Sequence, residues 1–378
     1  MKKNGTIGLV LGILCFILSL NAQTWDVPKR LTWTSDSSLS PAAAVDSNDH
    51  IYLVWDDRIS GNDELYFKKS TDGGTSWMNK RLTWSTGDSF RPAIAIDSNN
   101  SIYIVWTNDS SENDEIYFKK STDGGTSWTT QRLTWNSGTS DYPDIVTDSN
   151  NHIYIVWYDD IPGNTEIYFK KSTNGGTSWI TKRLTWTSKW SGGPKIAVDS
   201  NNHIYMVWSD STPGNVEIYF KKSTNGGTSW TTQRCTWNSG NSYYPDLAVD
   251  SLDHIHFVWY DWSPGNSEIY HKISTNGGSS WTTNRLSWTS EASYNPAIAT
   301  DSSNHIHVGW NEENPGNREI YYKRSTNGGA SWTLNRLTYN SGGSNDPSIA
   351  TDSSNNIYVF WFDYTPGNFE IFYKKGIQ

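Results

Sequence analysis

The chain has 378 residues, with 30 Lys and Arg against 39 Asp and Glu, and it is rich in Trp (22), Tyr (21) and Phe (11). So many rings among Ser, Thr, Asn and Gly favour short strands and tight turns, and they exclude a helical bundle, a coiled coil or a disordered chain. The acidic balance, without basic runs, argues against nucleic acid or anionic membranes as partners.

The N-terminus has the pattern of an export signal. Lys2 and Lys3 precede an apolar run over residues 7–20, and the small residue Ala22 suits cleavage before Gln23. A run of about 14 apolar residues is too short to span a bilayer as a helix. We therefore expect a signal peptide over residues 1–22 and a protein that is secreted, periplasmic or at the cell surface, with no membrane insertion after cleavage.

Seven internal repeats fill residues 23–378. The motif Arg-Leu-Thr-Trp begins at Arg30 and returns, with small changes, every 51 residues, at Arg81, Arg132, Arg183, Arg234, Arg285 and Arg336. The constant interval leaves no room for insertions, so the sequence predicts a single repeat domain.

Each repeat predicts four short strands. In the third copy we expect strands over residues 142–147, 152–157, 166–170 and 178–186, joined by turns rich in Asn, Asp, Gly and Pro. Seven such units predict an all-β fold, a seven-bladed β-propeller of four-stranded antiparallel blades.

The two ends of the chain predict how the ring closes. The last copy stops after its third strand, while the segment from Thr24 to Trp33 reads as a fourth strand without a blade. We expect this N-terminal strand to complete the last blade, which removes an exposed sheet edge.

Repetition also accounts for most of the Trp. One series ends the second strands, a second opens the fourth strands, and a third closes the fourth strands at Trp33, Trp84, Trp135, Trp186, Trp237 and Trp288, with Tyr339 in the last copy. We expect all three series to fill space within and between blades.

The turn before each fourth strand carries a recognisable motif. Ser70-Thr71-Asp72-Gly73-Gly74-Thr75-Ser76-Trp77 recurs from Ser121, Ser172, Ser223, Ser274 and Ser325. It resembles the Asp-box, or bacterial neuraminidase repeat (BNR), of sialidase-like β-propellers. The residues at the Asp position are Asp72, Asp123, Asn174, Asn225, Asn276 and Asn327. Because four of them are Asn, we expect them to cap the turn by hydrogen bonding rather than to do chemistry.

The resemblance implies a fold more than an activity, since its family includes sialidases, other glycoside hydrolases, sugar-binding propellers and non-enzymatic receptors. Aromatic residues break the repeat in the loops that would form the functional face, at Phe90, Tyr142, Trp190, Tyr243, Tyr244, Tyr294 and Trp262. A flat ring beside amides and carboxylates suits a sugar. We predict non-catalytic, multivalent recognition of a glycan or glycoprotein; sequence drift and packing between blades would explain the same rings.

A sialidase-like exo-glycoside hydrolase is the main alternative, and a cell-surface scaffold for protein interactions is another. The resemblance would imply an arginine clamp for a carboxylate and a Tyr–Glu pair near the axis, for which the candidates are Arg58, Arg91, Arg318, Tyr158, Tyr260, Tyr364, Glu312 and Glu313. No Arg-Ile-Pro is present. Seven blades of equal length should offer the same group seven times, whereas a catalytic centre needs different groups at one point.

Two further patterns bear on cofactors. Carboxylates recur two residues after the second-strand Trp, as at Asp57, and at the start of each third strand, as at Glu64. We expect them to cap turns or to pair with Lys and Arg, with calcium as the alternative. The His254/His256 and His305/His307 pairs have a metal-ligand pattern, but the other copies lack the second His, so no metal and no cofactor is predicted. The oligomeric state is left open.

Overall fold

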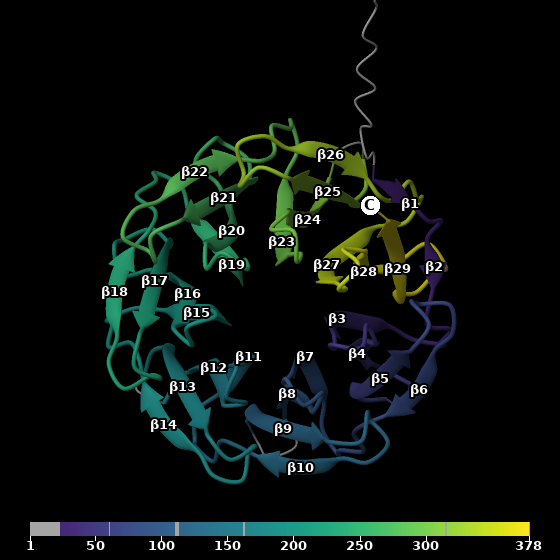
Figure 1. Cartoon of the computed structure of the whole chain (residues 1–378), viewed down its shortest axis with the longest axis horizontal. Coiled ribbons are helices and arrows are strands. Elements are labelled where there is room, and N and C mark those ends of the chain that lie inside the picture. The colour runs from purple at the N-terminus through teal and green to yellow at the C-terminus, as the bar shows by residue number, and fades with distance from the viewer. Residues whose placement is uncertain (1–22, 60, 110–112, 162, 314–315, 378) are drawn as a thin grey trace, which may run out of the picture.

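The computed structural model describes residues 23–377 apart from residues 60, 110–112, 162 and 314–315, and the regular elements in these segments are β-strands. The strands form seven antiparallel sheets, which are arranged as blades around a central axis (Figure 1). The predicted seven-bladed propeller is confirmed. The predicted signal peptide lies outside the described residues. Within them, no helix is long and apolar enough to cross a bilayer.

Each blade runs from an inner strand beside the axis to an outer strand on the wall of the ring. Blades one to three are β3 (Ser38–Val45), β4 (Ile51–Asp57), β5 (Glu64–Ser70) and β6 (Met78–Arg81); β7 (Ser89–Ile96), β8 (Ile102–Asn108), β9 (Glu115–Ser121) and β10 (Thr129–Arg132); and β11 (Ser140–Thr147), β12 (Ile153–Asp159), β13 (Glu166–Ser172) and β14 (Ile180–Arg183).

The remaining blades repeat this order. Blades four to six are β15 (Ser191–Val198), β16 (Ile204–Asp210), β17 (Glu217–Ser223) and β18 (Thr231–Arg234); β19 (Ser242–Val249), β20 (Ile255–Asp261), β21 (Glu268–Ser274) and β22 (Thr282–Arg285); and β23 (Ser293–Thr300), β24 (Ile306–Glu312), β25 (Glu319–Ser325) and β26 (Thr333–Arg336). Blade seven joins β27 (Ser344–Thr351), β28 (Ile357–Asp363) and β29 (Glu370–Ile377) to β1 (Thr24–Trp25) and β2 (Lys29–Arg30).

Blade seven closes the ring with strands from both ends of the chain. Thr24 pairs with Ile377, and Lys29 pairs with Tyr373. The Arg30 guanidinium lies 2.8 Å from the fully buried Glu370 carboxylate. The predicted closure by an N-terminal strand is confirmed.

The core lies between neighbouring blades as well as within them. The second strands are almost wholly buried because a blade covers each of their faces; Trp157 on β12 stacks on Tyr168 of β13 at 5.7 Å. One apolar cluster joins Tyr154 of blade three to Ile196 and Trp208 of blade four. Each blade is therefore stabilised by the next, as in other repeat folds.

The inner strands begin earlier than the sequence suggested. β11 starts at Ser140 rather than at Tyr142, because a β-bulge between Asp141 and Asp144 shifts its register against β12. The same bulge occurs in all seven inner strands. Several residues that were expected in loops therefore lie in strands that border the axis.

The third Trp series was predicted to fill space, and this prediction is wrong. The outer strand β6 ends at Arg81; Leu82 then enters the core, and the Thr83 hydroxyl accepts a hydrogen bond from the Leu65 amide at 2.8 Å. Trp84 is consequently turned outward and is 70% exposed. The equivalent side chains, which we call the outer belt, are 65–72% exposed: Trp33, Trp84, Trp135, Trp186, Trp237, Trp288 and Tyr339.

In each glycine turn before an outer strand, the side chain at the Asp position accepts hydrogen bonds from the turn backbone. The Asp72 carboxylate accepts hydrogen bonds from the Thr75 and Ser76 amides at 3.0 and 2.9 Å, and hydrogen bonds from the Ser76 hydroxyl and amide lower the pKa of Asp72 to about 2. Asn174 accepts from the Ser178 amide at 2.9 Å with its amide oxygen. The same hydrogen bond, from the amide of the serine four residues later, is accepted by the side chains of Asp123, Asn225, Asn276 and Asn327.

Candidate functional site

The bulges place one residue from every blade at the mouth of a central cavity of about 500 Å³. These seven residues, the mouth ring, each precede a proline on an inner strand: Ser40, Arg91, Tyr142, Gly193, Tyr244, Asn295 and Asp346. All have positive φ, between 47° and 60°. Residues other than glycine rarely adopt this backbone conformation, and those that do are often found at functional sites.

Two more positions of each blade differ from copy to copy beside the mouth ring. One is the residue before each mouth-ring member, and the other is its partner on the second strand, directly after the buried Trp. The pairs are Leu39–Asp56, Phe90–Thr107, Asp141–Tyr158, Gly192–Ser209, Tyr243–Tyr260, Tyr294–Asn311 and Asn345–Phe362. The expectation that equal blades offer the same group seven times is therefore wrong at these positions, because variation by substitution needs no change of length.

The aromatic candidates meet in one continuous cluster. Tyr142 stacks on Tyr158 at 5.6 Å and lies 6.2 Å from Tyr244, which stacks on Tyr260 at 5.9 Å. Tyr260 contacts Tyr243 and Tyr294 at 5.8 and 5.4 Å.

The two tryptophans outside the repeat extend this cluster at its sides. Trp190 lies 6.5 Å from Tyr243, and Trp262 lies 6.2 Å from Tyr294. Phe90 joins through Arg91, whose guanidinium is 5.2 Å from the Phe90 ring and 4.0 Å from the Tyr142 ring. All seven aromatic candidates thus lie in one connected surface that spans blades two to six.

A polar centre anchors this surface at Asp141. The buried Asp141 carboxylate accepts hydrogen bonds from Arg91, from the Thr107 hydroxyl at 2.7 Å and from the Tyr158 hydroxyl at 3.0 Å. Burial raises the pKa of Tyr158 above its ordinary value, so this phenol stays protonated. In this structure Tyr158 therefore acts as a hydrogen-bond donor to the Asp141 carboxylate.

A side pocket of about 340 Å³ opens between Tyr142, Trp190 and Tyr244. Trp190 can fold over Gly192 only because that residue is glycine, since a Cβ there would lie 2.4 Å from the indole. The pocket is also lined by Ser209, a buried residue whose hydroxyl has no hydrogen-bond partner among the described residues. Buried polar groups are normally satisfied, so this hydroxyl is available to a ligand or to water.

Asn311 is a second such group. It is fully buried beside Tyr294, and within the described part of the chain neither its amide nitrogen nor its amide oxygen has a partner. Sequence comparison of the copies missed Asp141, Ser209 and Asn311 as site residues. Their positions do vary from repeat to repeat, which is the signal that could have found them.

The structure does not gather the three candidate arginines into a clamp. Arg58 pairs with Asp63 at 3.1 Å, and Arg318 pairs with Glu313 at 3.1 Å. Of the three, Arg91 alone lines the central cavity. Each guanidinium is already matched by a carboxylate, Asp141 in the case of Arg91. Arg318 still reaches the edge of the aromatic surface, 5.7 Å from the Tyr294 ring.

The remaining catalytic candidates have structural contacts. Glu312 is buried and accepts a hydrogen bond from the Trp310 indole at 3.0 Å, which is the contact that Asp57 makes with Trp55 at 3.1 Å. Tyr364 is exposed and packs on Phe369 at 5.1 Å.

The repeated third-strand glutamates also have structural contacts, since they bind the outer strand of their own blade. The Glu64 carboxylate accepts hydrogen bonds from Arg81 at 2.9 Å and from the Ser85 amide at 2.8 Å. The expected pairing with arginine recurs at Glu115, Glu166, Glu217, Glu268, Glu319 and Glu370.

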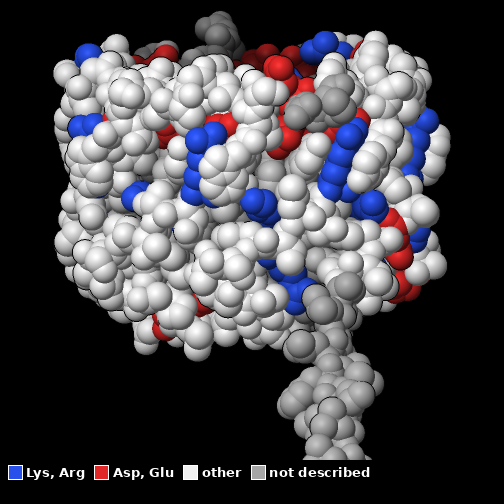
Figure 2. Space-filling model, turned by 90° about the horizontal axis from the view of Figure 1, so that it is seen from above, with Lys and Arg blue, Asp and Glu red and all other residues white. Residues whose placement is uncertain are grey.

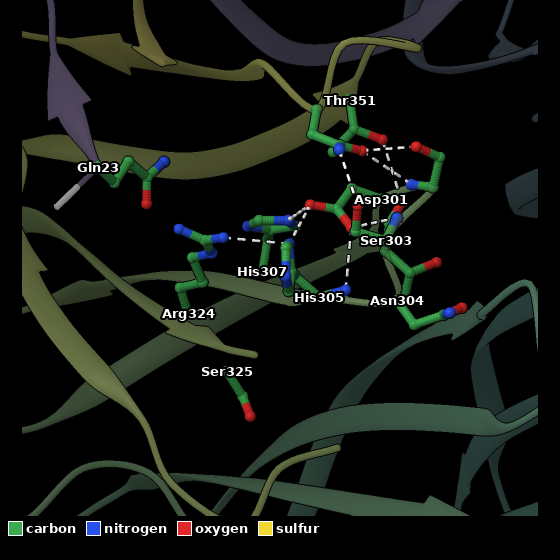
Figure 3. A network of polar contacts seen from close by, with 12 residues as sticks. Gln23, Asp301, Ser303, Asn304, His305, His307, Arg324, Ser325 and Thr351 are labelled. Carbon is green, nitrogen blue, oxygen red and sulfur yellow. Dashed lines mark hydrogen bonds and ion pairs between the residues drawn. The ribbon is translucent and has the colours of Figure 1, made fainter. Parts of the chain in front are cut away.

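The histidine pairs lie in hydrogen-bonded networks at the far ends of the second strands. Asp301 contacts His305 and His307 at 2.8 and 3.1 Å, and Arg324 lies 3.1 Å from His305 (Figure 3). In blade five the donor atoms of Asp250, His254 and His256 lie within 4.8 Å of one another, a grouping of metal-ligand type. In blade one a tyrosine takes the second histidine's place, since Tyr52 donates to Asp46 at 2.8 Å, so hydrogen bonding accounts for the arrangement.

No protein-family model and no curated protein matches the chain in sequence. Solved structures share its fold. The polysaccharide lyase Uly1 has a TM-score of 0.62 at 10% identity, over 96% of this chain and 94% of that one. A protein of unknown function from Dyadobacter fermentans has a TM-score of 0.60 at 12% identity, over 95% and 100%. The leech intramolecular trans-sialidase has a TM-score of 0.53 at 12% identity, over 93% and 70%. At these identities the likeness shows the fold alone.

Proposed function

We propose that this chain is a secreted, non-catalytic Asp-box propeller that binds a glycan at the mouth of its central cavity. The proposal rests on one observation: seven aromatic side chains that differ from the repeat converge on one face around Arg91 and Asp141. Half-buried rings offer the flat apolar surface that packs against a sugar, and the polar groups between them offer directional bonds to hydroxyls.

The site is one asymmetric surface rather than seven equal ones. Tyr142, Trp190 and Tyr244 would stack on the sugar, while the Ser209 hydroxyl, which lacks a protein partner, would bond to it. Two of the structural relatives, a polysaccharide lyase and a trans-sialidase, act on glycans by their names, which supports this class of ligand.

Arg58 and Arg318 pair with carboxylates and do not line the central cavity, so the described residues form no three-arginine clamp there, which favours binding over hydrolysis. The exposed mouth also differs from the closed, water-excluding sites that hydrolases build around a reacting bond. Tyr244 is 44% exposed, so a ligand could reach it without movement of a lid.

A glycan array probed with residues 23–378 tests the proposal, followed by calorimetry on the glycans that bind. Tyr244→Ala and Trp190→Ala should each weaken binding by about tenfold, the effect of losing roughly 1.4 kcal/mol of stacking. Tyr364→Ala is the matched control, since Tyr364 is 49% exposed but lies outside the cluster. Release of sugar from a bound glycan, lost in Tyr158→Phe, would overturn the non-catalytic assignment.

A further inference from the structure

The outer belt is a second set of aromatic side chains, and its members lie on the surface rather than in the core. Its seven members are 65–72% exposed, whereas the Trp series on the second strands is at most 2% exposed. Single exposed rings are common on protein surfaces. Seven at equivalent places, one on each blade, form a regular surface around the wall of the ring.

Each belt ring is in contact with an arginine side chain of its own blade. The guanidinium of the residue three positions earlier lies 5.5 Å from the ring centre at Trp84 and 5.6 Å at Trp33 and Trp186. The same contact recurs, at 4.4–5.9 Å, at Trp135, Trp237, Trp288 and Tyr339. Cation–π attraction holds these pairs together.

Each belt arginine forms an ion pair with a glutamate, and the exposed member of that pair is the cation. The glutamate partner of each belt arginine is buried, with its side chain at most 1% exposed, while the arginine side chains are 22–27% exposed. A lysine of the next blade adds to this charge at Trp288, where the Lys323 ammonium is 5.1 Å from the ring. Figure 2 shows Lys and Arg standing in stripes on the wall, with Asp and Glu gathered mainly toward the upper edge.

We infer that the outer belt is a binding surface for an anionic polysaccharide, one that bears uronate or sulfate groups. The rings offer stacking faces and the cations beside them offer partners for the acidic groups. The sites point outward in seven directions, so a flat membrane could touch only a few of them, whereas a flexible chain could follow the wall. Occupation of several weak sites by one chain would give avidity.

Nucleic acid fits this surface less well. Residues 23–378 carry a formal charge of −11, since removal of Lys2 and Lys3 leaves 28 Lys and Arg against 39 Asp and Glu. A phosphodiester backbone has a far denser charge than a polysaccharide with one acid per sugar, and the acidic edge beside the wall would repel it more strongly.

The test measures binding of polygalacturonate, chondroitin sulfate and uncharged dextran to residues 23–378 by biolayer interferometry. The acidic polymers should bind, binding should fall as NaCl rises, and the full polymer should bind about 10²-fold more tightly than its trisaccharide. A variant with all belt residues changed to Ala should bind the polymers at least about tenfold more weakly. Leu252→Ala, which removes a 61% exposed apolar side chain outside the belt, is the control and should bind normally.

A second measurement keeps the test decisive if the sevenfold variant does not fold. In the wild type, the acidic polymer should protect tryptophan fluorescence from acrylamide quenching, because the most exposed tryptophans lie in the belt. Absence of protection, equal binding of dextran, or equal binding of single-stranded DNA or anionic vesicles would overturn the inference. A glycan that binds at the mouth should still bind in calorimetry when the acidic polymer is present in excess, so that failure here and failure of the mouth site are distinguishable. Loss of that binding would place the polymer at the mouth and would overturn the inference.

Discussion

The hydroxyl oxygens of Tyr142 and Tyr244 lie 3.4 Å apart, although 102 residues separate them in the chain. They belong to β11 and β19, and the inner strand β15 lies between them with Gly193 at the matching position. Because Gly193 has no side chain, the two rings meet across the gap. A Cβ at Gly193 would have no atom within 4 Å, so the space is open.

Filling that space should block the mouth site. We expect Gly193→Tyr to reduce glycan affinity by about tenfold or more while the protein stays folded, since Tyr142 and Tyr244 already adopt the same positive φ. The strain should lower the free energy of unfolding by about 1–2 kcal/mol. Gly193→Ala, with similar strain but little added bulk, should bind normally in the same calorimetric assay; equal loss in both variants would contradict the steric explanation.

Ring closure should depend on a buried ion pair. Arg30→Ala should lower the free energy of unfolding by about 3 kcal/mol, because it leaves the buried Glu370 carboxylate without its guanidinium partner. Urea unfolding followed by tryptophan fluorescence measures this change. Arg58→Ala removes a pair whose arginine is 48% exposed and should change stability by no more than about 0.5 kcal/mol. Similar effects of the two substitutions would argue against closure by this pair.

Stability should fall as pH rises toward neutrality because of Asp56. Burial raises the pKa of Asp56 to about 7, whereas an unfolded Asp titrates near 3.9. Between these values the folded state keeps a proton that the unfolded state has lost, so the free energy of unfolding falls by at most about 1.4 kcal/mol per pH unit. Above the folded pKa this dependence ends.

Asp56→Asn isolates this contribution, since Asn resembles the protonated acid. Urea unfolding of wild type and variant between pH 4 and 8 should give curves that diverge as pH rises toward about 7, with the variant the more stable at neutral pH. Parallel curves would show that Asp56 ionises normally in the folded state.

The glycine turns should tolerate loss of charge but not loss of the hydrogen-bond acceptor. Asp72→Asn should leave the melting temperature nearly unchanged, because Asn174 makes the equivalent bond to the Ser178 amide at 2.9 Å. Asp72→Ala should lower the melting temperature, since it leaves the Thr75 and Ser76 amides without this acceptor. Differential scanning calorimetry compares the two; an equal loss would mean that the carboxylate charge itself matters.

The repeat was enough to predict the architecture, but it did not predict whether a given side chain is buried or exposed. The 51-residue interval and the unpaired segment near Trp25 were enough to predict seven blades and their closure. Trp84 and Trp106 are the same residue in the same repeat, yet one is 70% exposed and the other 2%. The difference arises because the outer strand ends at Arg81, a boundary that no local pattern marks.

The candidate site was predictable residue by residue but not as an assembly. Tyr142 and Tyr244 stood out because they break the repeat, but their contact depends on the bulges and on the empty position at Gly193. Arg58 looked equivalent to Arg91 in the sequence, although only Arg91 lies on a strand that borders the axis. Long-range geometry of this kind is set by tertiary packing, not by local propensity.

The bulge before each proline places one side chain at the mouth, whatever that side chain is. Ser40, Arg91, Tyr142 and Asp346 occupy equivalent positions there. Recombination between neighbouring repeats of the gene could therefore exchange one mouth residue for another while the frame persists. A molecule built this way could acquire new specificities by shuffling copies it already contains, without inventing a loop.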